Sequence, residues 1–189
     1  MYLFFDTETN DLPKNWKAPV SDLNNWPRLL QLSYLLYDEN QELIEEGNYY
    51  VKSPGIVISE KAFDINKLTV EFLEKKGIEL LTVLEKFKAV IEKADYLIAH
   101  NISFDENIVG SEFLRNGMEN LLENKGKVCT MLNTVDFCKI KGNFGFKWTK
   151  LEELYFILFN EKFEGAHDSL KDTKAMAKCF WKMIELEVI

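Results

Sequence analysis

Two acidic residues follow an apolar run near the start of the chain. Tyr2 to Phe5 favour a buried strand, and Asp6 and Glu8 stand two residues apart where that run ends. Residues two apart in a strand point to the same side, so both carboxylates can reach one cation. Such pairs are common on protein surfaces, but a buried strand delivers its last side chains into a crevice. The pair therefore indicates a site for a divalent metal ion.

Three further candidates lie at the starts of predicted helices. Asp105 falls in the first turn of one helix, where the helix dipole alone would also favour an acid. His167 and Asp172 flank the start of the last helix, with His167 in the preceding loop and Asp172 facing inward from the second turn. Taken singly, His167 could equally be a loop residue and Asp172 an exposed helix acid. Asp168 is the expected N-cap of that helix, and capping alone is a sufficient reason for an acid at this position.

The elements that must position these residues follow from hydrophobic patterning. Strands are predicted from residue 2, over 29–37 and up to about residue 51, with short links typical of an antiparallel meander. Apolar residues at intervals of three and four between Leu80 and Ile91 predict a long amphipathic helix. Beyond it we expect strands at 96–99 and 127–131 and helices at 103–116, 151–159 and 168–186, with Ser103 able to cap the first of these helices.

This order of elements predicts the fold class. Strands that are first joined by hairpins and later separated by helices imply a mixed sheet with helices on its faces. A chain of 189 residues that is 47% apolar is long enough for one compact core and too short for two ordinary domains. We therefore expect a single α/β domain spanning residues 1–189.

Charge and cysteine content narrow the function classes. A formal net charge of −8 argues against a protein that coats nucleic acid through basic patches, but cations held by clustered carboxylates would reverse the local sign. The three cysteines contain no C-x-x-C pair, which favours reduced thiols over disulfides or a zinc ribbon. No apolar run reaches membrane-spanning length and no signal peptide is expected, so the sequence predicts a cytoplasmic protein without a membrane partner.

Three motifs together resemble those of the DEDDh, or DnaQ-like, exonuclease family of the RNase H-like superfamily. They are Phe5-Asp6-Thr7-Glu8-Thr9, His100-Asn101-x-x-Phe104-Asp105 and His167-x-x-x-x-Asp172, in the family's order and spacing. Gln31, Cys129-Thr130-Met131 and Leu151-x-x-Leu154 are secondary matches. The resemblance implies an RNase H-like fold and a 3′-to-5′ exonuclease that releases nucleoside 5′-monophosphates.

The resemblance also implies residue roles. Asp6, Glu8, Asp105 and Asp172 would hold two divalent cations, and four hard oxygen donors suit Mg²⁺ or Mn²⁺. His167 would act as the general base, because a histidine titrates near neutral pH. The substrate would be the 3′ end of a single-stranded nucleic acid, DNA in preference to RNA, with the last nucleotide cradled by Thr7, Thr9, Leu12, Asn101 and Phe104.

Several points remain open at this level. Asn10-Asp11-Leu12 stands where the family often has Thr-Gly-Leu, and Asp64 to Thr69 replaces a stretch that commonly contains His and Gly, which puts substrate contacts in doubt. Trp16 and Trp26 could stack on a base or pack against the domain. A proofreading subunit serving a polymerase, an enzyme acting mainly on RNA and a catalytically silent binding module on the same fold are the alternatives.

Overall fold

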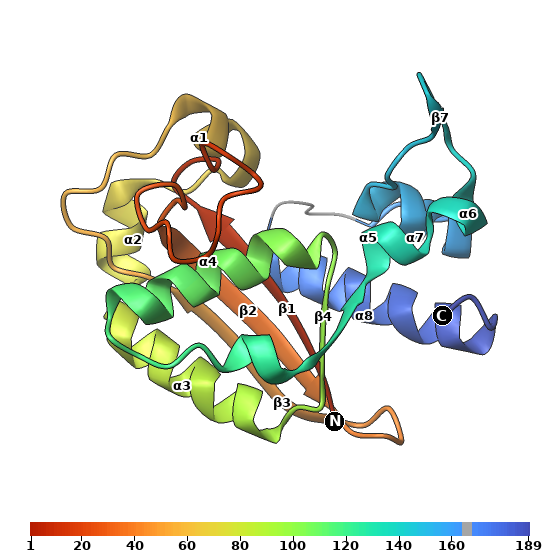
Figure 1. Ribbon diagram of the computed structural model, residues 1–189, viewed down its shortest axis with the longest axis horizontal. Helices are drawn as coiled ribbons and strands as arrows, with labels where there is room; N and C mark the ends of the chain where they lie inside the picture. Colours follow the sequence, from red (N-terminus) through yellow and green to blue (C-terminus); the bar gives the residue numbers. More distant parts are fainter. Residues whose placement is uncertain (164–167) are drawn as a thin grey trace.

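A five-stranded mixed sheet forms the centre of the computed structural model, which describes residues 1–163 and 168–189 (Figure 1). The strand order is β3-β2-β1-β4-β5. Strands β1, β2 and β3 pair antiparallel, whereas β4 is parallel to β1 and β5 is parallel to β4. The predicted meander followed by parallel strands is confirmed. The strands are β1 (Tyr2–Thr9), β2 (Leu29–Tyr37), β3 (Leu43–Tyr50), β4 (Tyr96–Ala99) and β5 (Gly126–Cys129).

Alternation along β1 assigns the long helices to the two faces of the sheet. Phe4 packs edge-on against Phe180 of α8 (Ser169–Glu185), with ring centroids 5.1 Å apart. Phe5 points the other way and meets Phe87 of α3 (Leu80–Lys93) at 5.4 Å. All four rings are buried, so both faces of β1 are covered. The helix α4 (Ile102–Arg115) follows β4 and contacts β1, β2, β4 and β5.

Shorter elements surround this framework. Ser59 and Thr69 cap two seven-residue helices, accepting hydrogen bonds from backbone N–H groups three residues on, which explains their formation without long apolar periodicity. A two-stranded hairpin lies beyond α6. These elements are α1 (Glu60–Asn66), α2 (Val70–Lys76), a 3-10 helix at Leu121–Asn124, α5 (Thr130–Asn133), α6 (Val135–Cys138), β6 (Lys141–Gly142), β7 (Gly145–Phe146) and α7 (Leu151–Phe159). No helix within the described ranges is long and apolar enough to cross a membrane.

Two predicted boundaries are wrong. The helix expected to start at Ser103 begins at Ile102, and its cap is Asn101 in the left-handed conformation, with φ 78°. Asn tolerates that conformation better than most residues, so the chain turns one residue earlier than a Ser cap would allow. The strand expected to reach Met131 ends at Cys129, because the backbone becomes helical from Thr130.

A buried carboxylate ties the loop between β1 and β2 to α4. Glu112 is fully buried and accepts hydrogen bonds from Nε of Arg28 at 2.7 Å and from the backbone N–H of Leu29 at 3.2 Å. Arg115 pairs with the same carboxylate at 3.0 Å and donates to the carbonyls of Leu23 and Trp26. These contacts fix the chain where it enters β2, beside the last residues of β1.

The two loop tryptophans have different surroundings. Trp26 is 3% exposed and its indole N–H donates to the carbonyl of Pro19, so it packs against the domain. Trp16 is 54% exposed and lies beside Phe104, with ring centroids 5.6 Å apart. Of the two, only Trp16 has a ring face open to a ligand.

Candidate active site

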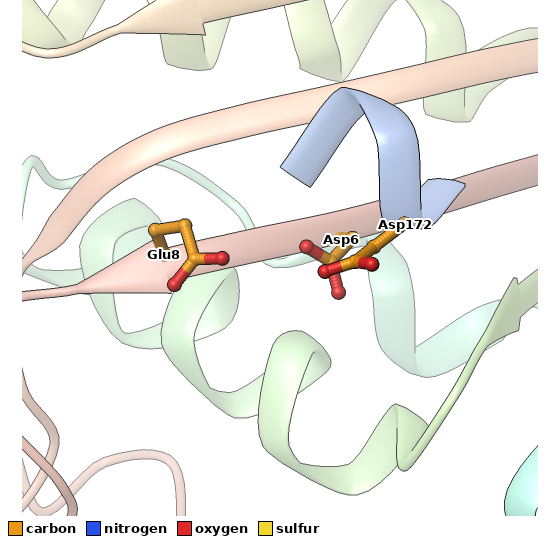
Figure 2. A group of neighbouring side chains, drawn as sticks. All are labelled: Asp6, Glu8 and Asp172. Carbon is orange, nitrogen blue, oxygen red and sulfur yellow. The ribbon is translucent and has the colours of Figure 1, made fainter. Parts of the chain in front are cut away.

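Three carboxylates meet at the carboxyl end of β1. Asp6 and Glu8 come from the strand and Asp172 comes from the first turn of α8, and each offers an oxygen within 4.8 Å of the others (Figure 2). Asp6 and Glu8 lie on the same face of β1 as Phe4, the face that α8 covers. The hydroxyl of Ser169 donates to the backbone carbonyl of Asp6 at 2.7 Å and fixes the start of α8 against the strand.

Asp168 begins the helix that carries Asp172. Its side chain accepts a hydrogen bond from the backbone N–H of Lys171 at 3.3 Å, so it is the N-cap of α8 as predicted. Asp172 lies one turn further on, and its backbone N–H donates to the carbonyl of Asp168 at 2.9 Å. The cap therefore sets where the inward-facing acid of α8 lies.

Asp105 lies next to this cluster but is not among the three clustered acids. Its Oδ1 accepts hydrogen bonds from the backbone N–H of Thr7 at 2.9 Å and from the Thr7 hydroxyl at 2.7 Å. Thr7 points to the opposite face of β1 from Asp6 and Glu8, toward α4. One oxygen of Asp105 is thus engaged by Thr7.

A break in strand register shapes the other end of the cluster. The pairing of β1 with β2 shifts between Glu8 and Thr9, an irregularity of the kind that re-aims side chains next to active sites. Asn66 of α1 is buried there and donates to the carbonyl of Thr9 at 3.1 Å. Its side chain also hydrogen-bonds to Glu8, which offsets part of the rise in the pKa of Glu8 that burial causes. The loss of regular pairing is therefore compensated by a side chain from a distant element.

The surroundings of the cluster disfavour the ionised form of its own carboxyl groups. Burial, followed by the charges of Asp105 and Glu8, raises the pKa of Asp6 well above its usual range. Burial and the charge of Asp172 raise the pKa of Glu8 to about 8. Burial raises the pKa of Asp105 to about 7 against the opposing effect of its hydrogen bonds from Thr7. A group of buried acids that repel one another fits a bound divalent cation, which would offset both burial and repulsion.

A pocket of about 460 Å³ opens beside the cluster. Asp6 and Asp172 line one side, and residues 148–152 line another, together with His100, Met131 and Phe163. The ring of His100 holds that second side in place, because Nε2 donates to the carbonyl of Thr149 at 2.8 Å and Nδ1 lies 2.9 Å from the hydroxyl of Thr130. Burial lowers the pKa of His100 to about 4, so the ring is neutral at physiological pH.

The residues expected to cradle a nucleotide lie around the same strand end. Thr7 and Thr9 are buried, and the Thr9 hydroxyl donates to the carbonyl of Asp11 at 2.7 Å. Leu12 is exposed. Asn101 caps α4, and Phe104, which directly precedes Asp105, is half-buried. The Thr7 hydroxyl donates its hydrogen bond to Asp105, so this side chain positions an acid and is not available to donate to a ligand.

Some residues of the site were not predicted from the sequence, and one predicted residue cannot be compared with the structure. His167 lies outside the described residues. Ser169, Asn66 and Thr149 were not singled out, although each makes a hydrogen bond that positions the cluster or its pocket. Ser169 follows the predicted cap Asp168, and Asn66 falls in the segment that departs from the family pattern, so both residues had a weak indication in the sequence. No sequence feature pointed to Thr149.

Replacing Glu8 with Gln should raise the thermal unfolding temperature of metal-free protein at about pH 9. The folded-state pKa of Glu8 is about 8, above its ordinary value of 4.5. The folded state therefore binds more protons than the unfolded state between these values, and stability falls as pH rises through that window. Gln removes the repelling charge. Thermal unfolding in a chelator at about pH 5 and pH 9 measures the effect, which should be small at the lower pH.

The exposed Glu119→Gln variant is the matched control and should leave the pH dependence unchanged. Mg²⁺ should stabilise the wild type more than Glu8→Gln, because a ligand that binds only the folded state stabilises it by mass action. A Glu8→Gln protein that is less stable than the wild type in chelator at the higher pH would contradict the electrostatic account.

Solved structures with the same fold include nucleases in complex with DNA. One is Escherichia coli exonuclease I bound to a dT13 oligonucleotide, with TM-score 0.76 and 18% identity, covering 97% of this chain and 40% of that one. The zinc-bound form of the E. coli exonuclease I complex with single-stranded DNA matches with TM-score 0.77 and 17% identity, covering 98% of this chain and 40% of that one. These matches establish the RNase H-like fold of the chain.

Relatives and a family profile complete the comparison. A PolC-type DNA polymerase III of Mycoplasmopsis pulmonis is 33% identical over 118 residues, which are 62% of this chain and 7% of the polymerase. The corresponding enzyme of Pediococcus pentosaceus is 28% identical over 120 residues, 64% of this chain and 7% of that polymerase. The chain thus spans a small part of each. The profile of the RNase_T family, described as exonuclease, matches residues 3–180, and the chain therefore belongs to the RNase_T exonuclease family.

Proposed function

We propose that the chain is a divalent-metal-dependent 3′-to-5′ exonuclease that removes nucleoside 5′-monophosphates from single-stranded DNA. The clustering of Asp6, Glu8 and Asp172 carries the proposal, because three hard oxygen donors within 4.8 Å suit Mg²⁺ or Mn²⁺. Membership of an exonuclease family supports the nuclease activity. One hydrophobic core joins β1, α3, α4, α7 and α8, which supports a single exonuclease domain.

Each acid has a distinct part in this proposal. Asp6 would help to hold both of two cations, since its pKa responds to the charges of both Asp105 and Glu8. Glu8 and Asp172 would hold one cation, and Asp105 the other. When bound, such cations stabilise charge on the attacking and leaving oxygens of an in-line displacement. Thr7 keeps Asp105 oriented through two hydrogen bonds.

Proton transfer would fall to His167. In the proposed reaction a water oxygen bonds to the terminal phosphorus, His167 takes a proton from that water, and the bond from phosphorus to the 3′ oxygen breaks. The nucleoside 5′-monophosphate leaves, and the 3′ oxygen of the shortened strand takes up a proton from bulk water to become a hydroxyl. His100 cannot fill this part, because Nε2 donates to the Thr149 carbonyl and Nδ1 lies against the Thr130 hydroxyl.

Similar proteins support the substrate class. Exonuclease I structures with the same fold were solved with dA16 and dT13 oligonucleotides. The sequence relatives are polymerases, which favours a second candidate, a proofreading activity linked to a DNA polymerase. A preference for a mispaired over a paired primer terminus would support that candidate. Equal rates on free single strands and mispaired termini would favour a free-standing enzyme.

Asp6→Asn should fold normally and lose almost all nuclease activity, because an amide oxygen is a poorer ligand for a divalent ion than a carboxylate oxygen. The assay digests 5′-labelled single-stranded DNA, duplex DNA and RNA with Mg²⁺ or Mn²⁺. For the wild type we expect a ladder that shortens from the 3′ end, fastest on single-stranded DNA. Asp136→Asn, an exposed acid on α6, is the matched control. Full activity of Asp6→Asn, or internal cutting by the wild type, would overturn the proposal.

His167→Ala should lower the single-turnover rate by roughly 10²- to 10⁴-fold while metal affinity stays near that of the wild type. The two readouts separate proton transfer from metal binding, because a general base moves a proton without holding the cation. The wild-type rate should rise with pH through the range where a histidine loses its proton, and His167→Ala should lack that step. Both are measured with saturating metal at every pH. An unchanged rate and pH profile would remove His167 from the mechanism.

A further inference from the structure

A basic, aromatic segment lies next to the candidate active site and takes no part in the chemistry described above. We call residues 139–150, which contain β6 and β7, the basic hairpin. It carries Lys139, Lys141, Lys147 and Lys150 and no acidic residue, within a chain of net charge −8. It is therefore a concentrated positive region on an otherwise acidic protein.

The hairpin presents aromatic rings to solvent instead of burying them. Figure 1 shows β7 projecting away from the sheet and its covering helices. Phe144, at the tip between the two paired strands, is fully exposed, Trp148 is 67% exposed and Phe146 is 47% exposed. Exposed aromatic side chains gathered on one element gain nothing for the core and are typical of a binding surface.

The lysines of the hairpin are mostly free for a ligand. Within the described part of the chain, Lys147 is the one of the four that forms an ion pair, with Glu153 at 2.5 Å. Lys139, Lys141 and Lys150 are exposed. Exposed cations interleaved with exposed rings complement a ligand that has both anionic groups and planar faces.

The hairpin is continuous with the candidate active site. Trp148 and Lys150 line the same pocket as Asp6 and Asp172. Between them, Thr149 is buried and its carbonyl is held by His100, which directly follows β4, the neighbour of β1 in the sheet. A strand whose 3′ end reaches the acids would therefore meet the base of the hairpin first and its tip further along.

We propose that the basic hairpin binds the part of a single-stranded nucleic acid that precedes the terminal nucleotide. Bases would stack on Phe144 and Trp148, and Lys139 and Lys141 would contact phosphates. The inference rests on the proposed function, since it takes the 3′ end to be at the acids. A protein ligand fits less well, because a run of lysines interleaved with exposed rings and without acids matches phosphates and bases more closely.

Fluorescence anisotropy with labelled oligo-dT tests the hairpin directly. All proteins carry Asp6→Asn, so that strands stay intact, and are compared in the presence of Mg²⁺. Adding Phe144→Ala should weaken binding of an oligonucleotide of about 12 nucleotides by roughly 5- to 100-fold, the range expected for loss of one stacked base. The affinity gained between about 3 and about 12 nucleotides should largely disappear. Tyr96→Ala, 46% exposed at the opposite end of β4, is the matched aromatic control.

A charge variant measures the phosphate contacts independently. Replacing both Lys139 and Lys141 with Ala should lower the slope of log affinity against log salt by roughly 1.4, since each contact with a single strand contributes about 0.7. The exposed pair Lys75 and Lys76 on α2, replaced together by Ala, should leave the slope unchanged. Circular dichroism confirms that each variant is folded.

The outcomes separate this inference from the proposed function. Unchanged affinity and salt slope in both hairpin variants overturn the inference, and would direct attention to a protein ligand for the hairpin, even if the wild type digests DNA from its 3′ end. Weakened binding in the hairpin variants supports it. If the wild type then digests no strand, the proposed function alone fails, because binding at the hairpin does not depend on cleavage.

Discussion

Repulsion among buried and half-buried carboxylates is the constraint around which this structure is organised. Asp6, Glu8 and Asp172 offer oxygens within 4.8 Å of one another, and burial and mutual charge raise the pKa values of Asp6 and Glu8. Such an arrangement opposes folding at neutral pH without a cation. It is held together by the packing of Phe180 on Phe4 and by the bond from the Ser169 hydroxyl to Asp6, which fix α8 on β1 whatever the charge state. The packing of the core thus offsets the repulsion among the acids and keeps them together at the site.

The distribution of charge follows from the same constraint. A net charge of −8 would repel nucleic acid from most of the surface, and the acids of the site would do so most strongly. Cations in the cluster would reverse that sign where a phosphate must lie. The basic hairpin supplies positive charge beside the pocket without metal. The attraction would therefore be confined to one path, which suits an enzyme that acts on strand ends and not on the length of a duplex.

Much of the fold and part of the site follow from local pattern, and the remainder depends on contacts between distant residues. The apolar run before Asp6 and the spacing to Glu8 were sufficient to predict a strand with two acids on one side. The contact of Asp105 with Thr7 joins residues 98 apart in sequence, and depends on which face of β1 lies against α4. The bond from His100 to Thr149 spans 49 residues. Strands β6 and β7 have two residues each, too few for alternation to be recognised.

The proposed activity depends on a divalent-cation site at the end of β1. Anomalous scattering from crystals grown with Mn²⁺ tests it most directly, because the signal locates the ion without assuming an activity. The account predicts a peak roughly 2–2.5 Å from carboxylate oxygens of Asp6, Glu8 and Asp172. A second peak should lie between the carboxylates of Asp6 and Asp105. Crystals with Mn²⁺ bound elsewhere on the protein and no peak within reach of these acids would contradict the account.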